Sequence, residues 1–439
     1  MGNPPFLGAR VMSKEQSAEI ACLFNGVKNA GNLDYVTGWY KKAADYIKDA
    51  TIKCAFVSTN SICQGQQVPI LWPLLFSQGI HIDFAHQTFK WSNEARGNAA
   101  VYCITVGFSL NKDSDKKLFL YEDVKDVPKE VPAKQINAYL MDAQNVFIDS
   151  RSKTIEERTK PLLFGSMPND GGHLIIELNE YEDFIKQEPE SQKYIKTFIG
   201  AEEFINNKKR YCLGLVNAEP KHLKQCPHIL ERIQKVREHR EHSSREATRK
   251  LAAMPSLFGE IRQPETGNYL LIPRVSSERR RYIPIGFLDV SVIASDSTLI
   301  VPNATLYEFG ILTSQMHMAW TRTVCGRLEM RYRYSAQIVY NNFPWPEASE
   351  SQKESIAQKA QAVLDARNKF PESSLADLYD PDTMPSVLVK AHAALDSAVD
   401  KLYRKTAFPD DAARTAFLFE LYGKKTEGLT SRTKKQGGR

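Results

Sequence analysis

Asn3, Pro4, Pro5 and Phe6 stand together in the opening MGNPPFLGAR, and their types suit chemistry on an aromatic amine. The amine of adenine is a poor nucleophile because its lone pair is delocalised into the ring. The side-chain oxygen of Asn3 and the backbone carbonyl of Pro4 could accept its two hydrogens and favour a tetrahedral nitrogen. Proline rings fix φ, so both acceptors would be in place before substrate arrives. The alternative is an ordinary Asn-Pro turn.

Aromatic rings are the second feature that such chemistry needs, because a base extruded from a duplex is held by stacking. Phe6 offers one ring, and the FKW segment offers Phe89 and Trp91 for the other face of the base. Trp91 is slightly preferred, although spacing alone does not separate it from Phe89. The alternative for this second cluster is an aromatic side chain packed in the core.

The segment GRLEMRYRYS carries charged residues at alternate positions, namely Arg327, Glu329, Arg331 and Arg333. In a single strand these side chains would share one face. Glutamate can accept from cytosine N4 and arginine can bind guanine O6 and N7, so Glu329 and Arg331 could read one C·G pair. Arg333 would read or support a neighbouring pair, and Arg327 would contact the DNA backbone. The alternative is a surface ion-pair ladder between residues i and i+2.

The segment RVSSERRRY adds a second basic group, Arg274, Arg279, Arg280 and Arg281. We expect these arginines to contact DNA phosphates, which position a protein without specifying sequence. The alternative is a solvated loop. The net charge of +6 and the pI of about 8.7 are weak evidence for a nucleic-acid partner by themselves.

Cysteine and histidine spacing predicts no metal site. The seven cysteines are scattered without a C-x-x-C pair, which argues against structural zinc or a disulfide framework and for a reducing cytoplasm. His239 and His242 lie three residues apart within 235–250, but no Cys or carboxylate has ligand spacing. That stretch, KVREHREHSSREATRK, is interpreted as an exposed helix with i, i+4 ion pairs.

Hydrophobic periodicity predicts the elements that hold the first motifs. Residues 15–49 are predicted to be helical, and KCAFVSTNSI is predicted to be a buried parallel strand that ends in a polar loop. A helix over 66–79 and strands over 80–89 and 98–109 follow. The order strand, helix, strand, strand indicates the second half of a doubly wound α/β sheet.

The remainder of the chain is predicted to be mixed α/β and then helical. Strands are expected over HLIIEL and YLLIPRV, and helices over 181–199, 227–253, 349–370 and 386–405. The predicted fold class is therefore α/β plus α+β. It comprises a partial doubly wound (Rossmann-like) sheet, a mixed α/β domain and a small helical C-terminal domain. No apolar run approaches the roughly 20 residues that span a membrane.

Several long segments resemble the MmeI-like (type IIL) single-chain restriction–modification enzymes, from residue 2 to about residue 423. They include NPPFLGAR, LDYVTGWYKKAADYI, FKWSNEARGNAAVYCITVGF and TLYEFGILTSQMHMAWTRTVCGRLEMRYRYS. The resemblance implies the C-terminal half of an S-adenosylmethionine-dependent adenine-N6 methyltransferase domain over residues 1–145. It further implies a DNA target-recognition domain over 146–346, a helical C-terminal domain over 347–425 and a basic tail over 426–439.

Two features that this family leads us to expect are missing from the printed sequence: the glycine-rich F-x-G-x-G loop and a nuclease constellation. S-adenosylmethionine is therefore expected as a cofactor of the full-length enzyme and not of this chain alone, and cofactor-binding residues remain unassigned. We expect the chain to be the C-terminal part of a larger enzyme, either a truncated reading frame or a designed fragment.

The predicted function is the DNA adenine-N6 methylation and recognition part of a restriction–modification enzyme, inactive alone. One alternative is a DNA-binding specificity subunit that acts with a separate catalytic chain, and another is a degenerate remnant without activity. The expected partners are double-stranded DNA and, for the specificity subunit, that separate chain. We expect a cytoplasmic protein with no membrane partner.

Overall fold

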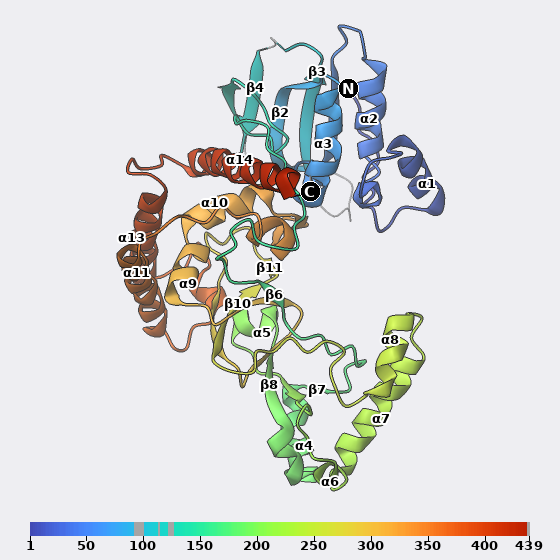
Figure 1. Cartoon of the computed structure of the whole chain (residues 1–439), viewed down its shortest axis with the longest axis vertical. Helices are drawn as coiled ribbons and strands as arrows, with labels where there is room; N and C mark the ends of the chain where they lie inside the picture. The colour runs from blue at the N-terminus through green and yellow to red at the C-terminus, as the bar shows by residue number, and fades with distance from the viewer. Residues whose placement is uncertain (92–100, 113–114, 122–126, 437–439) are drawn as a thin grey trace. The chain divides into compact units, whose positions relative to one another are not determined.

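The computed structural model describes residues 1–91, 101–112, 115–121 and 127–436, and Figure 1 shows their elements. The chain forms two compact units, each of which mixes helices and strands. Unit 1 contains residues 1–157, 319–346 and the segment from 406 onward, whereas unit 2 contains residues 158–318 and 347–405. Each unit is therefore built from segments that are far apart in the sequence. One boundary falls within helix α10 (Gln315–Val324).

The described strands of unit 1 form a five-stranded sheet in the order β1-β3-β2-β4-β5. They are β1 (Cys54–Thr59), β2 (His81–Trp91), β3 (Val101–Ser109), β4 (Lys116–Leu120) and β5 (Lys129–Ala133). Strand β3 lies antiparallel to both β1 and β2, so β1 and β2 run in the same direction. Strand β4 pairs parallel with β2 and antiparallel with β5. The predicted order strand, helix, strand, strand is confirmed by β1, α3 (Val68–Ser77), β2 and β3.

The prediction that the segment KCAFVSTNSI forms a parallel strand needs a correction, because β1 within it pairs with the antiparallel strand β3. The chain reverses after β2, and β3 then lies between the two strands that run in the same direction. Parallel pairing of β1 comes from a bridge between Gly2 and Phe56. The Gly2 amide nitrogen lies 3.0 Å from the Ala55 carbonyl oxygen, and the Val57 amide nitrogen lies 3.0 Å from the Gly2 carbonyl oxygen.

Helices α1 (Lys14–Leu23), α2 (Thr37–Tyr46), α3 and α14 (Asp411–Gln436) also belong to unit 1. The continuous helix predicted over 15–49 is interrupted between α1 and α2. Gly26 and Asn29 there adopt φ values of 79° and 62°, which a right-handed helix excludes. Tyr40 of α2 and Trp72 of α3 are fully buried, with ring centroids 6.1 Å apart, and they form part of the core.

Unit 2 contains two small sheets of described strands, in the orders β12-β10-β14-β6 and β13-β8-β9-β7. The first comprises β6 (Leu163–Phe164), β10 (Asn268–Pro273), β12 (Gly286–Asp289) and β14 (Thr298–Pro302). The second comprises β7 (Ile175–Ile176), β8 (Ile195–Ile199), β9 (Tyr211–Leu213) and β13 (Ile293–Ala294). Strand β10 is almost wholly buried and confirms the strand predicted over YLLIPRV, and the short β11 (Val275–Ser276) follows it. The strand predicted over HLIIEL is reduced to β7, because a helix begins at Leu178.

The helices of unit 2 lie between and after these strands. They are α4 (Leu178–Gln187), α5 (Ala201–Asn206), α6 (Pro220–Leu223), α7 (Pro227–Glu241), α8 (Glu246–Lys250), α9 (Leu306–Leu312), α11 (Glu350–Asn368), α12 (Leu375–Leu378) and α13 (Ser386–Tyr403). The predicted helix over 181–199 is wrong in its second half. Glu188 precedes Pro189 and so leaves the helical region, and residues 195–199 form β8. The helix predicted over 227–253 is divided into α7 and α8, whereas α11 and α13 confirm the two C-terminal helices.

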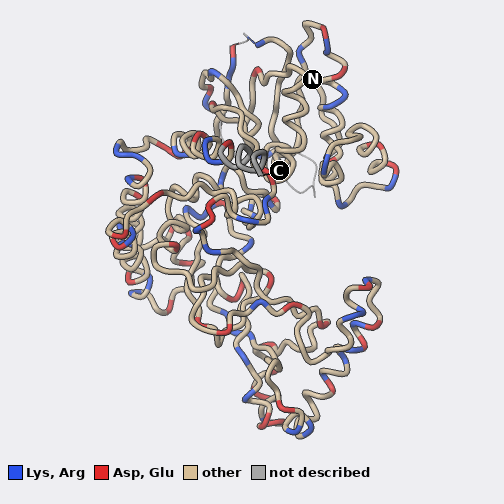
Figure 2. The backbone as a smooth tube through the Cα atoms, viewed as in Figure 1, with Lys and Arg blue, Asp and Glu red and all other residues tan. Residues whose placement is uncertain are grey.

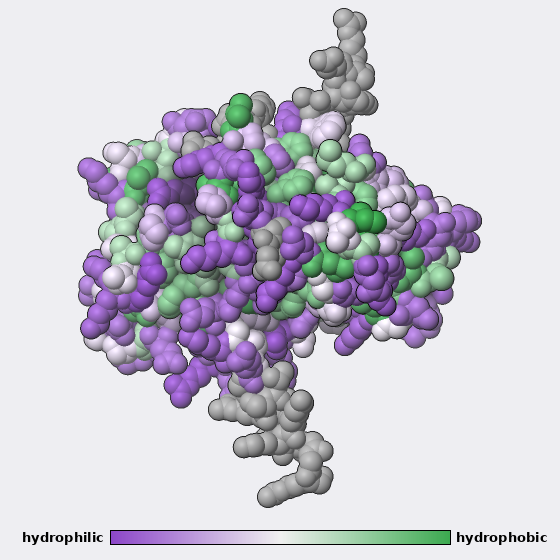
Figure 3. Space-filling model, turned by 90° about the horizontal axis from the view of Figure 1, so that it is seen from above, coloured by the Kyte–Doolittle hydropathy of each residue, from purple (hydrophilic) through white to green (hydrophobic). Residues whose placement is uncertain are grey.

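Hydrophilic residues cover most of the face drawn in Figure 3. None of the helices in the described part of the chain combines the length and the apolar character needed to cross a membrane.

Arg240, near the C-terminal end of α7, is a buried charged residue that binds backbone groups of neighbouring segments. Its side chain donates to the backbone carbonyls of Pro168, Asn169, Leu251, Met254 and Leu257, at 2.7–3.0 Å. The residue is 1% exposed, and burial lowers the pKa of its guanidinium group. Burying a charge is costly unless it is hydrogen-bonded, and these carbonyls compensate for the water that Arg240 has lost. Arg240 thereby fixes α7 to the chain before β7 and to the turn after α8.

We expect Arg240→Ala to lower the free energy of unfolding by about 3 kcal/mol, because the buried carbonyls would lose their donor. Urea unfolding monitored by far-UV circular dichroism measures this change. Arg237 is an exposed arginine on the same helix. Arg237→Ala should therefore change the free energy by less than about 0.5 kcal/mol. Equal losses in the two variants would contradict the role of Arg240.

Candidate functional site

The Asn-Pro-Pro-Phe motif directly follows the residue that bridges to β1 in parallel. The motif therefore leaves the sheet in the direction in which β1 ends, and ligands of open α/β sheets bind at such carboxyl ends. Asn3 is exposed, Pro4 is buried and Phe6 is half-buried. The side chain of Asn3 is therefore accessible to solvent.

Asp34 ties the loop after the motif to the segment that follows β1. The Ala9 amide donates to Asp34 Oδ1 at 3.1 Å, and the Ser61 hydroxyl donates to Asp34 Oδ2 at 2.6 Å. The Tyr35 amide donates to the Leu7 carbonyl at 2.9 Å. Sequence reasoning did not single out Asp34 or Ser61. The polar end of KCAFVSTNSI was the signal available, and it indicated only a loop.

Phe89 and Trp91 lie at the end of β2 and differ in exposure. Phe89 is half-buried and stacks on Tyr121, with ring centroids 5.6 Å apart. Trp91 is 44% exposed, and its ring centroid lies 6.2 Å from that of Phe89. Phe89 thus resembles the packed aromatic of the alternative interpretation, whereas Trp91 remains accessible. The first residues of the strand predicted over 98–109 lie outside the described part of the chain.

The charged segment GRLEMRYRYS forms a hairpin and not the single strand that its alternation predicted. Strand β15 (Arg327–Leu328) pairs antiparallel with β16 (Arg331–Arg333). Glu329 lies in the turn with a φ of 58°. Because the chain reverses at Glu329, the predicted row of four charges on one strand face does not exist. Arg331 and Arg333 are exposed on β16.

Arg327, predicted to contact the DNA backbone, is engaged within the hairpin. Its guanidinium group donates to the carbonyls of Met330 and Arg322, each at 2.9 Å. It also lies 4.1 Å from the centroid of the Tyr332 ring. These contacts hold the strands and the turn together and tie the hairpin to the end of α10, which gives Arg327 a structural role in the free protein.

Glu329 and Arg331 form the i, i+2 ion pair that was considered as the alternative to base reading. Their side chains are 3.0 Å apart and are 73% and 46% exposed. Exposed ion pairs contribute little to stability, so opening this pair costs little. The pair is therefore compatible with DNA contact as well as with an isolated surface role.

Two glycines bring the hairpin against the segment after β1 within unit 1. Gly65 has a φ of 58°, and a Cβ there would lie 3.1 Å from the Gly326 Cα. Only glycine allows this backbone conformation together with this close approach. A cavity of about 340 Å³ in the same unit is lined by residues that include Asn60, Gln87 and Arg322. The hairpin and the sheet that carries the motif therefore belong to one body.

The arginines of RVSSERRRY belong to unit 2, and two of them are drawn into the protein. Arg274 donates to the Asp296 carbonyl at 2.8 Å and lies over the Phe164 ring at 4.9 Å. Burial lowers the pKa of the Arg280 guanidinium group. Both side chains are partly buried, so they are less accessible to a DNA phosphate than arginines in a solvated loop would be.

The other two arginines face carboxylates of the C-terminal helical segment. Arg279 donates to Asp382 at 2.6 Å, and Arg281 lies 3.9 Å from Asp396. Neighbouring Tyr282 is buried, and its hydroxyl donates to Asp396 at 2.6 Å. The basic segment is thus anchored at both carboxylates, and its two exposed arginines already have anionic partners.

The basic stretch over 235–250 confirms the interpretation as a helix with ion pairs. Basic and acidic residues interleave along α7 and α8 (Figure 2). Lys235 pairs with Glu231 at 2.7 Å and Lys250 pairs with Glu246 at 2.8 Å, both four residues apart.

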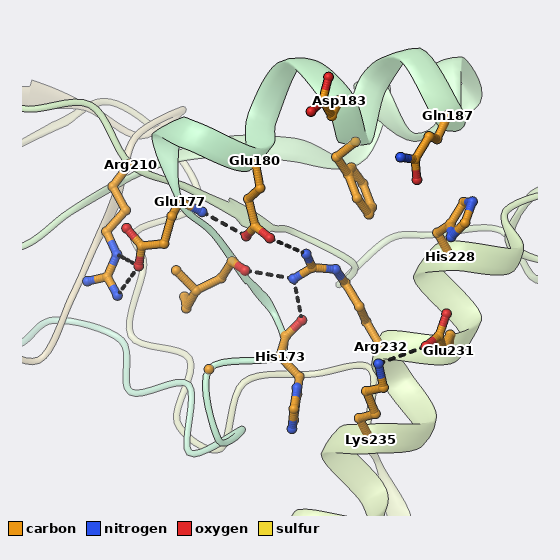
Figure 4. A pocket seen from close by; sticks show the side chains of 13 residues that line it. His173, Glu177, Glu180, Asp183, Gln187, Arg210, His228, Glu231, Arg232 and Lys235 are labelled. Carbon is orange, nitrogen blue, oxygen red and sulfur yellow. Dashed lines mark hydrogen bonds and ion pairs between the residues drawn. The ribbon is translucent and has the colours of Figure 1, made fainter.

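A pocket of about 500 Å³ between α4 and α7 contains charges of both signs (Figure 4). Arg232 lies within it and donates to Glu180 at 2.9 Å and to the Ile175 carbonyl at 2.8 Å. Arg210 lies 2.9 Å from Glu177. The pocket's lysine, on α7, has the glutamate partner described above. Because these cations face carboxylates, the pocket offers no excess positive charge for phosphate, and we assign no ligand to it.

No described residue can be assigned to S-adenosylmethionine. The printed sequence has no F-x-G-x-G loop, and hence no acidic residue after one to hold a ribose. Among the residues that the structure describes, no three His, Cys, Asp or Glu side chains gather as a metal site. No step of the chemistry below is assigned to either group.

Asp396, which anchors the basic segment, is a buried carboxyl group. The residue is 6% exposed, and burial raises the pKa of its carboxyl group to about 6. Nearby Arg281 lowers this pKa and Asp400 raises it. The Gln315 amide donates to the carboxyl group at 2.7 Å and the Tyr282 hydroxyl at 2.6 Å, so the group has donors in either protonation state.

We expect the wild type to lose stability relative to Asp396→Asn as the pH rises from about 4 to about 6. The folded state holds the Asp396 proton more tightly than the unfolded state, so ionisation in this interval disfavours the fold. The variant keeps an acceptor but cannot ionise. Urea unfolding at a series of pH values measures the difference in free energy, which should become constant above this interval. A difference that does not change with pH would contradict the assignment.

Comparison with known proteins places these features in one family. Family models of MmeI match in succession: the DNA-methyltransferase domain at residues 1–121, the target recognition domain at 142–347 and the C-terminal domain at 348–430. DNA methyltransferase A of Bacillus subtilis (strain 168) is 44% identical over 428 residues, which are 97% of this chain and 48% of that protein.

A solved structure of the type IIL restriction-modification enzyme MmeI in complex with DNA has the same fold. It matches with a TM-score of 0.91 and 48% sequence identity, over 97% of this chain and 57% of that chain. The chain therefore spans about half the length of the relatives that it matches. The three successive domain matches and the common fold over nearly the whole chain show that this protein belongs to the MmeI-like family.

Proposed function

We propose that this chain supplies the adenine-holding and DNA-reading parts of a site-specific DNA adenine-N6 methyltransferase of a restriction–modification system. The observation that carries the proposal is the position of Asn3. It is the first residue beyond the parallel bridge to β1, its side chain is exposed, and the following Pro4 is buried. This arrangement combines a rigid backbone with an accessible amide at a ligand-binding edge.

The side chains divide the chemistry as follows. Asn3 Oδ1 and the Pro4 carbonyl oxygen accept the two hydrogens of the adenine amine, which frees the nitrogen lone pair for alkylation. Phe6 stacks on one face of the extruded base, and the accessible Trp91 suits the other face better than the packed Phe89. The amine proton leaves to water after alkylation, so no strong base is required.

The methyl group would come from S-adenosylmethionine. The printed sequence lacks the F-x-G-x-G loop, so methyl transfer by this chain requires a cofactor-binding segment from elsewhere. We therefore propose that the isolated chain binds double-stranded DNA without methylating it. The alternative is a DNA-binding specificity subunit that acts with a separate catalytic chain carrying the missing motifs.

DNA reading is assigned to the hairpin of unit 1. The exposed Glu329 and Arg331 would open their ion pair and contact one C·G pair, and the exposed Arg333 would contact or support a neighbour. Arg327 supports the hairpin. Phosphate contacts are assigned to the exposed Arg279 and Arg281, because Arg274 and Arg280 are partly buried.

The role of Asn3 is tested by measuring N6-methyladenine in digested DNA after incubation with S-adenosylmethionine. Two preparations are compared: the chain purified from its native cells with any co-purifying protein, and the recombinant chain alone. In the preparation that methylates, Asn3→Ala should reduce the rate by about 100-fold, since one preorganised polar group contributes on this scale. Asn3→Asp keeps an acceptor and should retain part of the rate.

Asn25→Ala, which removes an exposed asparagine from the same unit, is the matched control and should leave the rate unchanged. Methylation that needs the co-purifying protein and is unchanged by Asn3→Ala would favour the specificity subunit. DNA binding without N6-methyladenine in either preparation would contradict the proposed role in methylation. Binding to DNA that does not weaken with salt would contradict both proposals, because phosphate contacts release counterions.

The double variant Glu329→Lys, Arg331→Asp tests the hairpin. We expect the preferred base to change at one position of the recognition sequence, with other positions unaffected. Selection of bound duplexes from a randomised library measures this preference. The swap preserves net charge, so the slope of affinity against salt should also be preserved. An unchanged sequence preference would remove the assignment of these two residues.

A further inference from the structure

The loop that follows the Asn-Pro-Pro-Phe motif is held at two successive points by the segment before α2. The Leu7 carbonyl accepts from the Tyr35 amide at 2.9 Å. The Ala9 amide donates to the Asp34 carboxylate at 3.1 Å. Because the consecutive residues Asp34 and Tyr35 bind the loop at two points, they restrain both its position and its direction. The Asn-Pro-Pro-Phe motif lies at the N-terminal end of this loop.

The second oxygen of Asp34 holds a different segment. The Ser61 hydroxyl, directly after β1, donates to it at 2.6 Å. The Ser61 hydroxyl also lies 2.8 Å from that of Thr59, the last residue of β1. The carboxylate therefore bridges the loop after the motif and the loop after the neighbouring strand. Both loops leave the sheet in the same direction.

The backbone of Asp34 is itself held by hydrogen bonds, so its side chain can restrain both loops. Its amide donates to the side-chain oxygen of Gln67 at 3.0 Å, and Gln67 is buried. Its carbonyl accepts from the Thr37 hydroxyl at 2.7 Å, in the first turn of α2. The carboxylate is half-buried and uses one oxygen for each loop.

We propose that Asp34 is a positioning residue that fixes the adenine-holding motif relative to the loop after β1 and thereby sets the rate of methyl transfer. This inference rests on the proposed function, because it assumes that Asn3 and Pro4 hold the reacting amine. Asp34 does not touch the amine. It acts through Ala9 and Ser61, which keep the two acceptors where the sheet places them.

A purely structural role at the start of α2 predicts different results from a positioning role. Asp34→Ala removes both acceptor oxygens. Asp34→Asn can keep the geometry, because its remaining oxygen still accepts from Ala9 and its amide can donate to the Ser61 hydroxyl. Positioning therefore predicts rescue by asparagine. Asp45→Ala, which removes an exposed carboxylate from α2, serves as the matched control.

Hydrogen exchange followed by mass spectrometry tests the restraint on the 439-residue chain without any activity. In Asp34→Ala, peptides covering residues 6–12 should exchange about tenfold faster, which is the effect of losing one hydrogen bond. Peptides from β2 and β3 should not change. Asp34→Asn and Asp45→Ala should match the wild type. Unchanged exchange in residues 6–12 of Asp34→Ala would overturn the inference.

Steady-state kinetics then tests the consequence in the preparation that forms N6-methyladenine. We expect kcat to fall about tenfold in Asp34→Ala, with KM for DNA within about twofold, and Asp34→Asn to restore kcat. A loosened loop with unchanged kcat would overturn the role in methyl transfer. If neither the recombinant chain nor the chain with its co-purifying protein forms N6-methyladenine, the proposed role in methylation fails and the claim about rate fails with it. The exchange measurement still decides whether Asp34 holds the loop.

Discussion

Two backbone hydrogen bonds between Gly2 and β1 determine where the Asn-Pro-Pro-Phe motif lies. They pair the chain in parallel with β1, so both segments leave the sheet at the same edge. Pro4 and Pro5 have no amide hydrogen and cannot continue the ladder, so the chain must depart after Gly2. The prolines that we propose hold the carbonyl acceptor therefore also end the pairing. Asn3 becomes the first residue beyond the sheet, where its amide meets solvent and not the core.

Elements with long, consistent hydrophobic patterns could be predicted from the sequence. β1, α3, β2 and β3 follow the predicted order, and β10, α11 and α13 lie where periodicity indicated. Boundaries failed where a local conformation overrides the pattern. Positive φ at Gly26 and Asn29 separates α1 from α2, and Pro189 ends α4 before a strand. The motif at Asn3 could be singled out because its four residues are consecutive, and its catalytic role stays a prediction.

The supports of the site could not be predicted, because their partners are distant in the sequence. Asp34 meets Ala9, Ser61 and Gln67 at separations of 25, 27 and 33 residues, and no spacing rule connects them. The hairpin was wrongly predicted as a single strand for a related reason. Alternating charges suit one strand or two paired strands equally well, and a turn at Glu329 carries no glycine or proline to reveal it. The approach of Gly65 to Gly326 that supports the hairpin appears only in the folded chain.

Three of the arginines assigned to DNA, Arg279, Arg281 and Arg331, already have carboxylate partners, and this limits what net charge can indicate about binding. Glu329 faces Arg331, and Asp382 faces Arg279. A phosphate that takes Arg279 leaves Asp382 to attract a cation, so the exchange releases fewer ions than a contact by an unpaired arginine. Because exposed pairs contribute little stability, the exchange costs little free energy. Pairing with carboxylates lowers the nonspecific affinity of these arginines for DNA. It does not prevent them from contacting a DNA site whose shape and sequence fit the protein. Specificity can therefore depend on the rigid hairpin rather than on a surplus of positive charge.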